Sequence, residues 1–209
     1  MNTTSQTPGQ LYVVAAPSGA GKTSLVRGLL EQEPSARFSI SYTTRKQRPT
    51  EQNGRDYFFV DHTAFERMVA AGEFLEHARV FDNYYGTARA QVAALLAQGA
   101  NVILEIDWQG AQQVRRAMPE CRSIFILPPS RTELERRLRG RGTDAEAVIQ
   151  RRLQDAASDM GHWSEFDFVV INADFAQALA ELKAIVLGQG EHLRAQRPEL
   201  AAQVAVLMA

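Results

Sequence analysis

The sequence predicts an α/β fold in which a central parallel sheet lies between two layers of helices, forming a three-layer αβα core. Three observations carry this prediction. Short, apolar, β-branched runs alternate with amphipathic helical patterns along most of the chain. A glycine-bearing turn joins the first of these strands to the first helix. A middle region of short strands and turns interrupts the alternation, which predicts an inserted lobe of mixed strands and a helix.

Bulk composition narrows the class of protein. The chain has 209 residues, of which 45% are hydrophobic, enough for one domain with a sizeable core. Its 23 Lys and Arg residues nearly balance 24 Asp and Glu residues, whereas proteins that hold nucleic acid usually carry a basic excess. Residues 1–10 are polar, and no segment approaches the ~20 apolar residues of a membrane span. We therefore expect a cytoplasmic protein that binds neither nucleic acid nor membrane, as a monomer or a homo-oligomer.

The core elements follow from local patterns. Residues 11–15 (LYVVA) predict a buried strand, and residues 22–30 place their apolar side chains on one helical face. Ser130 and Glu133 have the spacing of a capping box and begin a further helix. The other core elements expected are strands at 102–106, 123–127 and 168–171 and helices at 87–98, from 110, at 144–160 and at 175–187.

The middle region predicts the lobe and completes the division of the chain into parts. Expected here are strands at 38–42, 57–60 and 74–80, a helix at 61–71 that Asp61 caps, and an aromatic loop at 82–86. The predicted parts are a flexible segment at 1–10, a domain at 11–187 and a helical tail at 188–209. The domain divides into a core at 11–40, 91–136 and 153–187, the lobe at 41–90, and a small lid segment at 137–152.

A phosphate-binding loop follows the first strand. Residues 16–23 (APSGAGKT) match the P-loop pattern G-x-x-x-x-G-K-[ST] everywhere except at Ala16. In such a loop the main-chain N–H groups converge on phosphate oxygens, and the helix that follows directs its positive end at them. Lys22 reaches the β- and γ-phosphates, and the Thr23 hydroxyl binds Mg²⁺. The predicted ATP-binding residues of this loop are Pro17, Ser18, Gly19, Ala20, Gly21, Lys22 and Thr23.

A second predicted metal ligand follows a buried strand. Asp107 ends the apolar run 102–106, where an acidic residue can hold Mg²⁺ through water. The alternative is that it caps the helix expected from residue 110. Together, the loop and this carboxylate predict an enzyme that binds a nucleoside triphosphate, without specifying the second substrate.

Five further motifs resemble the bacterial guanylate kinase family, and the resemblance covers residues 11–187. The motifs are SYTTRKQRP at 41–49, GRDY at 54–57, FLE at 74–76, NYYGT at 83–87 and IDWQG at 106–110. The phosphate loop is common to many families, but this combination is specific. The resemblance implies a P-loop fold and a Mg²⁺-dependent phosphoryl transfer, with ATP and GMP as the small-molecule partners.

The resemblance also implies roles for individual residues. Those that match the residues holding the GMP phosphate are Ser41, Arg45, Arg48, Tyr57 and Tyr85. Those that match the residues reading guanine are Glu76, Thr87 and Asp107. The matches to arginines that close over the transferred phosphoryl group are Arg137, Arg141 and Arg152, and Asn172 matches the adenine-side loop. The chain departs from the family at Ala16 and Glu105, where Gly and Asp are frequent.

The chemistry of these side chains agrees with the implied roles. A GMP phosphate is largely a dianion at neutral pH, because its second pKa is about 6, and Arg45 and Arg48 offer forked donors to it. Guanine presents N1–H and N2–H₂ donors, which suit a Glu76 carboxylate, and an O6 acceptor, which suits the hydroxyl of Thr87 or Ser41. Taken singly, the arginines are also typical of a solvated surface and the tyrosines of a lobe core.

An ionised phosphate oxygen is already a nucleophile, so the reaction needs no general base. The four histidines are accordingly expected to be structural or exposed. Catalysis is expected from positioning and charge neutralisation, with the catalytic residues Lys22, Arg45, Arg137, Arg141 and Arg152. Two alternatives are a scaffold domain of the same fold, which typically lacks the loop lysine or the closing arginines, and a ribose-bisphosphate kinase, which should lack the guanine-reading set.

Overall fold

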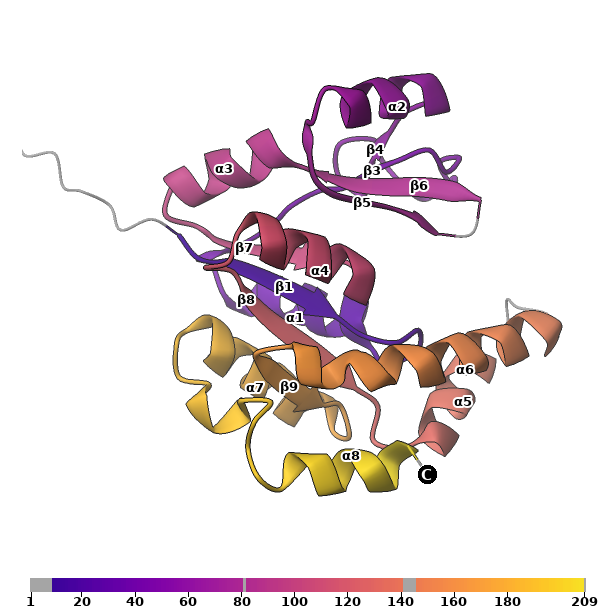
Figure 1. Cartoon of the computed structure of the whole chain (residues 1–209), viewed down its shortest axis with the longest axis vertical. Coiled ribbons are helices and arrows are strands. Elements are labelled where there is room, and N and C mark those ends of the chain that lie inside the picture. Colours follow the sequence, from indigo (N-terminus) through magenta and orange to yellow (C-terminus); the bar gives the residue numbers. More distant parts are fainter. Residues whose placement is uncertain (1–8, 81, 141–145, 209) are drawn as a thin grey trace, which may run out of the picture. The chain divides into compact units, whose positions relative to one another are not determined.

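The computed structural model describes residues 9–80, 82–140 and 146–208 (Figure 1). The chain forms two compact units. The first unit comprises the residues up to Leu11, Ser35–Leu104 and Gln109–Cys121, and the second comprises Tyr12–Pro34, Glu105–Trp108 and Arg122–Ala209. Arg141 lies outside the described residues, and so does Asp144, the first residue of the helix expected at 144–160.

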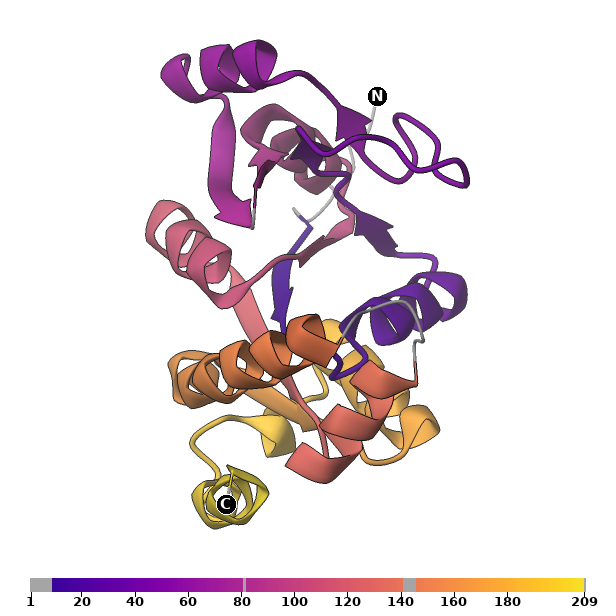
Figure 2. The same ribbon diagram turned by 90° about the vertical axis from the view of Figure 1, so that its right-hand side faces the viewer.

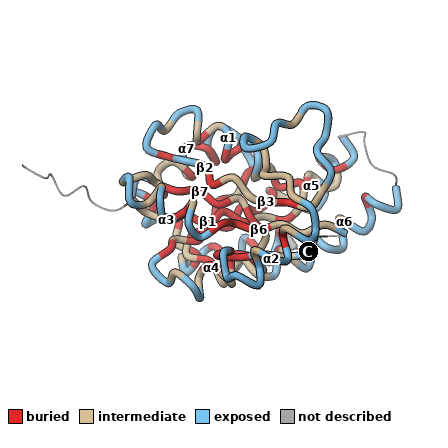
Figure 3. Tube along the Cα trace, turned by 90° about the horizontal axis from the view of Figure 1, so that it is seen from above, coloured by how far each residue is buried: buried red, intermediate tan, exposed pale blue. Residues whose placement is uncertain are grey.

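The predicted parallel sheet is confirmed, with five strands in the order β2-β7-β1-β8-β9. The strands are β1 (Leu11–Ala15), β2 (Ala36–Phe38), β7 (Asn101–Glu105), β8 (Arg122–Leu127) and β9 (Phe168–Ile171). β8 pairs in parallel with β1 and with β9, and β2 pairs in parallel with β7. Most residues of these strands are buried (Figure 3), as continuous apolar runs predict for strands covered on both faces.

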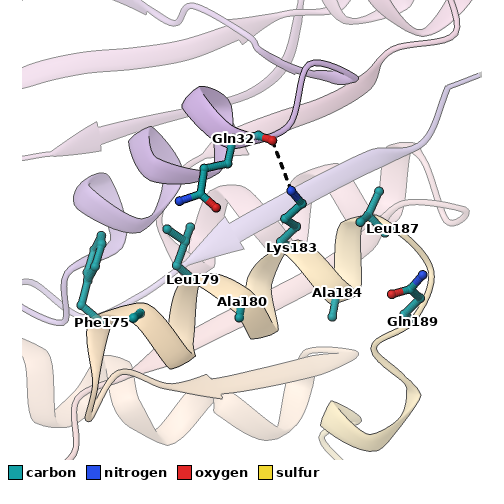
Figure 4. A pocket seen from close by; sticks show the side chains of 9 residues that line it. Gln32, Phe175, Leu179, Ala180, Lys183, Ala184, Leu187 and Gln189 are labelled. Carbon is teal, nitrogen blue, oxygen red and sulfur yellow. Dashed lines mark hydrogen bonds between the residues drawn. The ribbon is translucent and has the colours of Figure 1, made fainter.

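Helices α1 (Lys22–Gln32) and α7 (Phe175–Val186) lie side by side in the second unit (Figures 3 and 4). They approach closely at Gly28, where an added Cβ would lie 3.0 Å from a methyl carbon of Leu179. Lys183 donates a hydrogen bond to the last carbonyl of α1 at 3.2 Å. Gly28 therefore allows Leu179 of α7 to pack closely against α1.

Helices α5 (Arg131–Arg139) and α6 (Glu146–Met160) also pack against each other in the second unit (Figure 2). Ser130 caps α5 as predicted, because its hydroxyl accepts a hydrogen bond from the Glu133 N–H at 3.1 Å. The small core between the helices consists of Leu134, Leu138, Ile149 and Ala156, with Leu153 at its edge. The last elements are η1 (Gly161–Glu165), η2 (Glu191–Leu193) and α8 (Leu200–Met208).

The first unit contains a second, mixed sheet with the order β4-β3-β6-β5. Its strands are β3 (Tyr42–Thr43), β4 (Phe58–Phe59), β5 (Phe74–Val80) and β6 (Asn83–Ala88). β3 and β4 are parallel, whereas β6 is antiparallel to both β3 and β5. Helix α2 (His62–Ala70) is capped as predicted by Asp61, whose carboxylate accepts from the Ala64 N–H at 2.7 Å. The remaining helices are α3 (Arg89–Ala97) and α4 (Trp108–Ala117).

The predicted bounds around β6 are wrong. The sequence pattern predicts a loop at 82–86 and a helix from 87, but this segment is strand β6 and α3 begins only after it. The reason is pairing across a hairpin, in which Thr87 lies opposite Glu76 of β5. The expected strand 38–42 is also divided, because its ends belong to different sheets.

None of the helices in the described residues is both long enough and apolar enough to span a membrane.

Gly86 of β6 lies against the aromatic core of the first unit. Phe65 stacks on Phe74 with ring centroids 4.5 Å apart and on Tyr84 at 5.5 Å. A Cβ at Gly86 would lie 2.9 Å from Phe74 and 3.1 Å from Phe65. This position therefore needs glycine because the two rings leave no room for a side chain.

We expect Gly86→Ala to lower the free energy of unfolding by about 1–3 kcal/mol, because the added methyl group must displace the rings. Chemical denaturation measures the change. Gly161→Ala is the matched control, since an added Cβ there meets no atom of the described residues within 4 Å. Equal losses of stability in the two variants would contradict the packing argument.

Candidate functional site

The loop between β1 and α1 has the shape of a phosphate-binding turn. Gly19 and Gly21 have φ angles of 91° and 97°, which favour glycine. Helix α1 then begins at Lys22, so the first main-chain N–H groups of the helix, which have no acceptor within the helix, follow the turn directly. The Lys22 ammonium donates a hydrogen bond to the Ile106 carbonyl at 2.7 Å, which fixes the side chain near the carboxyl end of β7.

A hydroxyl and a carboxylate are paired beside this loop. The Thr23 hydroxyl donates a hydrogen bond to Glu105, the last residue of β7. Both groups present oxygen, the atom type that Mg²⁺ prefers. Glu105 is not among the predicted site residues, although it is an acidic residue at the end of a buried strand, the same signal that predicted Asp107.

The donor set around Thr23 fits a magnesium ion bound together with a nucleotide. The described parts of the chain contain no cluster of three or more His, Cys, Asp or Glu side chains that could hold a metal by themselves. Mg²⁺ commonly keeps several waters and takes further oxygens from substrate phosphates, so one or two protein oxygens are enough.

Asp107 belongs to the second unit, lies between β7 and α4, and is half-buried. Next to it, Trp108 donates through Nε1 to Asp159 at 2.9 Å and stacks on His162 with ring centroids 3.6 Å apart. Burial raises the pKa of Asp159, and the negative charges of Asp107 and Asp155 act in the same direction. The residue after Asp107 is thus anchored to α6 and η1.

Two predicted site residues contact the main chain of the phosphate loop. The Asn172 side-chain amide donates to the Ala20 carbonyl at 2.7 Å. Arg137 donates to the same carbonyl at 3.3 Å and to the Asn172 carbonyl at 3.0 Å. Glu133 accepts from Arg137 at 2.8 Å, and hydrogen bonds from Arg136 and Arg137 lower the pKa of Glu133 to about 2. Arg137 is therefore held in place from α5 as well as from the loop.

The other predicted residues of the triphosphate side are placed as follows. The Ala20 N–H donates to the Pro17 carbonyl at 3.2 Å, which closes the turn, and Ser18 is half-buried. Arg152 lies on α6 and is half-buried. Arg141 lies outside the described residues, so its role stays a prediction.

The first unit contains a buried carboxylate. Glu76 is 4% exposed and Thr87 is 0% exposed, on neighbouring strands β5 and β6. The Thr87 hydroxyl donates to Glu76 Oε1 at 2.6 Å. A carboxylate removed from water needs such donors, and it can accept further hydrogen bonds from the N–H groups of a ligand. The structure thus brings together two of the three residues predicted to read guanine, and places the third, Asp107, in the other unit.

A basic and aromatic cluster lies in the same unit as Glu76. Arg45 forms an ion pair with Glu51 at 2.7 Å, with only 17% and 13% of the two side chains exposed. The Arg45 guanidinium carbon lies 5.5 Å from the ring centroid of Tyr57, which is edge-on to Tyr85 at 5.9 Å. Hydrogen bonds from the Arg45 side chain and from the Arg48 N–H lower the pKa of Glu51. The carboxylate therefore keeps Arg45 beside the two tyrosines.

Two other predicted phosphate ligands are positioned less tightly. The Arg48 side chain is 70% exposed and lies 4.0 Å from Glu51. The Ser41 carbonyl accepts a hydrogen bond from the Phe58 N–H at 2.9 Å, which ties its main chain to β4. Glu51 is not among the predicted site residues, and its one signal in the sequence is an acidic residue three positions after Arg48 in a basic segment.

Comparison with known proteins identifies relatives of this chain. The family model described as "Guanylate kinase" matches residues 8–189. The chain is 56% identical over 194 residues to the guanylate kinase of Alkalilimnicola ehrlichii, covering 93% of this chain and 96% of that protein. It is 53% identical over 191 residues to the guanylate kinase of Escherichia coli K12, covering 90% and 91%. The solved structure of guanylate kinase from Anaplasma phagocytophilum matches with a TM-score of 0.73 and 33% identity, covering 94% of each chain.

We expect Thr87→Val to lower the free energy of unfolding by about 1–3 kcal/mol, because valine keeps the shape of threonine but removes a donor from the buried Glu76 carboxylate. Urea denaturation at neutral pH measures this loss. Thr87→Ser is the control, since it keeps the hydroxyl and should lose only the ~0.8 kcal/mol of one methyl group. A valine variant no less stable than the serine variant would be inconsistent with the proposed hydrogen bond.

Proposed function

The chain belongs to the guanylate kinase family, and from this premise we propose that it transfers the γ-phosphoryl group of ATP to GMP, giving ADP and GDP. As a member of that family it is a nucleoside monophosphate kinase, and so a phosphotransferase. The observation that supports this acceptor most is the buried pair of Glu76 and Thr87. The phosphate loop by itself does not specify an acceptor, whereas a buried carboxylate calls for a ligand that donates hydrogen bonds.

On the donor side, ATP binds through its phosphates to the loop 17–23. The main-chain N–H groups of the loop and of the first turn of α1 surround the β-phosphate, and Lys22 neutralises the β- and γ-oxygens. A Mg²⁺ ion would be held by the Thr23 hydroxyl, with Glu105 and Asp107 acting through bound water. The ion would supply charge neutralisation on the transferred phosphoryl group.

On the acceptor side, GMP binds through its phosphate and through its guanine base. Arg45, Tyr57 and Tyr85 bind the phosphate, together with Ser41 and Arg48. The Glu76 carboxylate accepts from guanine N1–H and N2–H₂, which adenine cannot match, because it has an acceptor at N1 and no amino group at C2. A base that places an acceptor instead of a donor against such a carboxylate is strongly disfavoured.

The reaction then needs positioning and charge neutralisation. The attacking GMP phosphate oxygen is already ionised, so none of the protein's side chains has to remove a proton. Lys22 acts on the donor phosphates and Arg45 on the acceptor phosphate. The three lid arginines, Arg137, Arg141 and Arg152, neutralise the phosphoryl group in transfer.

A substrate panel tests this function. We expect the purified protein to release ADP from ATP with GMP, and not with AMP, dTMP or ribose bisphosphate, and only when Mg²⁺ is present. Lys22→Met should lower kcat by about 10²–10³-fold, because it removes a preorganised positive charge, while the affinity for GMP is retained. Lys183→Met on α7 is the control for loss of a lysine. Turnover of another acceptor in place of GMP would show that the function is assigned wrongly.

We expect Glu76→Gln to raise the Kd for GMP about 10- to 100-fold, since hydrogen bonds to a charged group contribute about 1.5–3 kcal/mol. Titration calorimetry with GMP and IMP measures the effect. IMP lacks the N2 amino group, so its affinity should fall less than that of GMP, and the affinity for ATP should not change. Equal losses for GMP and IMP would mean that Glu76 does not contact the N2 amino group.

A further inference from the structure

The contacts of the phosphate loop point to a positioning role for Asn172. We propose that its side chain fixes the direction in which the Gly21 N–H points, and so holds the loop ready for a triphosphate. The inference rests on the proposed function, because it concerns how this loop binds the phosphates of ATP. It differs from the contact on the adenine side that the family resemblance implies for the same residue.

One peptide group, between Ala20 and Gly21, joins the Ala20 carbonyl to the Gly21 N–H. The described residues contain no cis peptide bond, and in a trans peptide the C=O and the N–H point in opposite directions. The Ala20 carbonyl accepts a hydrogen bond from the Asn172 side-chain amide at 2.7 Å. A donor that holds this carbonyl therefore also aims the Gly21 N–H away from Asn172.

Gly21 and Asn172 also approach each other very closely. A Cβ on Gly21 would lie far inside van der Waals contact with Asn172 Nδ2. The Gly21 φ angle of 97° independently favours glycine. Glycine at this position thus serves the turn and also leaves the space that the Asn172 amide occupies.

Asn172 is itself held in place by burial and by hydrogen bonds of its main chain. It is 4% exposed, and its main-chain N–H donates to the Leu127 carbonyl at 2.8 Å, which continues the pairing of β9 with β8. Arg137 bridges the carbonyls of Asn172 and Ala20, at 3.0 Å and 3.3 Å. The buried Asn172 therefore connects the parallel sheet, through its main chain, to the phosphate loop, through its side chain.

The consequence concerns affinity for phosphate. Donors that are aimed before the ligand arrives lose less freedom on binding than donors that must reorient. If the Ala20–Gly21 peptide group turned over, its carbonyl dipole would face the phosphate and oppose binding. Asn172 is thus a positioning residue that acts on the triphosphate through the loop.

The test separates the phosphates of ATP from its base. We expect Asn172→Ala to weaken the binding of Mg²⁺–ATP and of Mg²⁺–tripolyphosphate by the same factor, roughly 3- to 30-fold, with GMP affinity unchanged. Titration calorimetry on the full-length protein measures all three. Asn101→Ala is the matched control, because the Asn101 side-chain amide donates to the exposed Ser35 hydroxyl, at 3.2 Å, within the first unit. Asn172→Ser replaces the alanine variant if the latter does not fold. It should also weaken the binding of Mg²⁺–ATP and of Mg²⁺–tripolyphosphate by equal factors.

Each other outcome has a distinct meaning. Weaker ATP binding with unchanged tripolyphosphate binding would overturn the inference and assign Asn172 to the base. Unchanged affinities with a lower melting temperature would also overturn it, leaving only a structural role. Wild-type protein that binds neither ligand would instead reject the proposed function.

Discussion

A loop that binds phosphate with main-chain N–H groups has to turn its carbonyls the other way, and those carbonyls need donors of their own. In this chain the Ala20 carbonyl receives them from Arg137 and Asn172, which lie 117 and 152 residues further along. The loop therefore takes its working shape only when the strands and helices of the second unit have assembled. Lys22 and Thr23 follow directly, so their directions depend on the same peptide group.

The acceptor side depends on a buried negative charge. Removing the Glu76 carboxylate from water is unfavourable, and the Thr87 hydroxyl offsets part of that cost. In the proposed function, a guanine base donates two further hydrogen bonds to this carboxylate. Arg45 is held in a comparable way, by an ion pair with Glu51 beside the tyrosines. In the proposed function, selectivity arises from the cost of placing a base that does not donate hydrogen bonds against this buried charge.

Elements whose structure is determined by residues adjacent in the sequence could be predicted from it. The phosphate loop and the caps at Asp61 and Ser130 are of this kind, and so are the apolar strands of the parallel sheet. Strand β6 could not be predicted, because its tyrosines and glycine are typical of a turn. They form a strand in the fold because β5 pairs with them. The carboxylates of Glu51 and Glu105 were not predicted because what distinguishes each is its partner, Arg45 or Thr23, and these pairings are known only from the fold. The contact of Asn172 with the loop is also invisible to local patterns.

We propose that the main-chain amides of one loop bind the phosphates of ATP, while a separate set of side chains binds GMP. Amide NMR shifts test it most directly, with a non-hydrolysable Mg²⁺–ATP analogue and GMP titrated separately. The analogue should shift the amides of Gly21, Lys22 and Thr23, and GMP alone should shift those around Glu76 and Thr87. Loop amides that stay in place when the analogue is saturating would contradict the account.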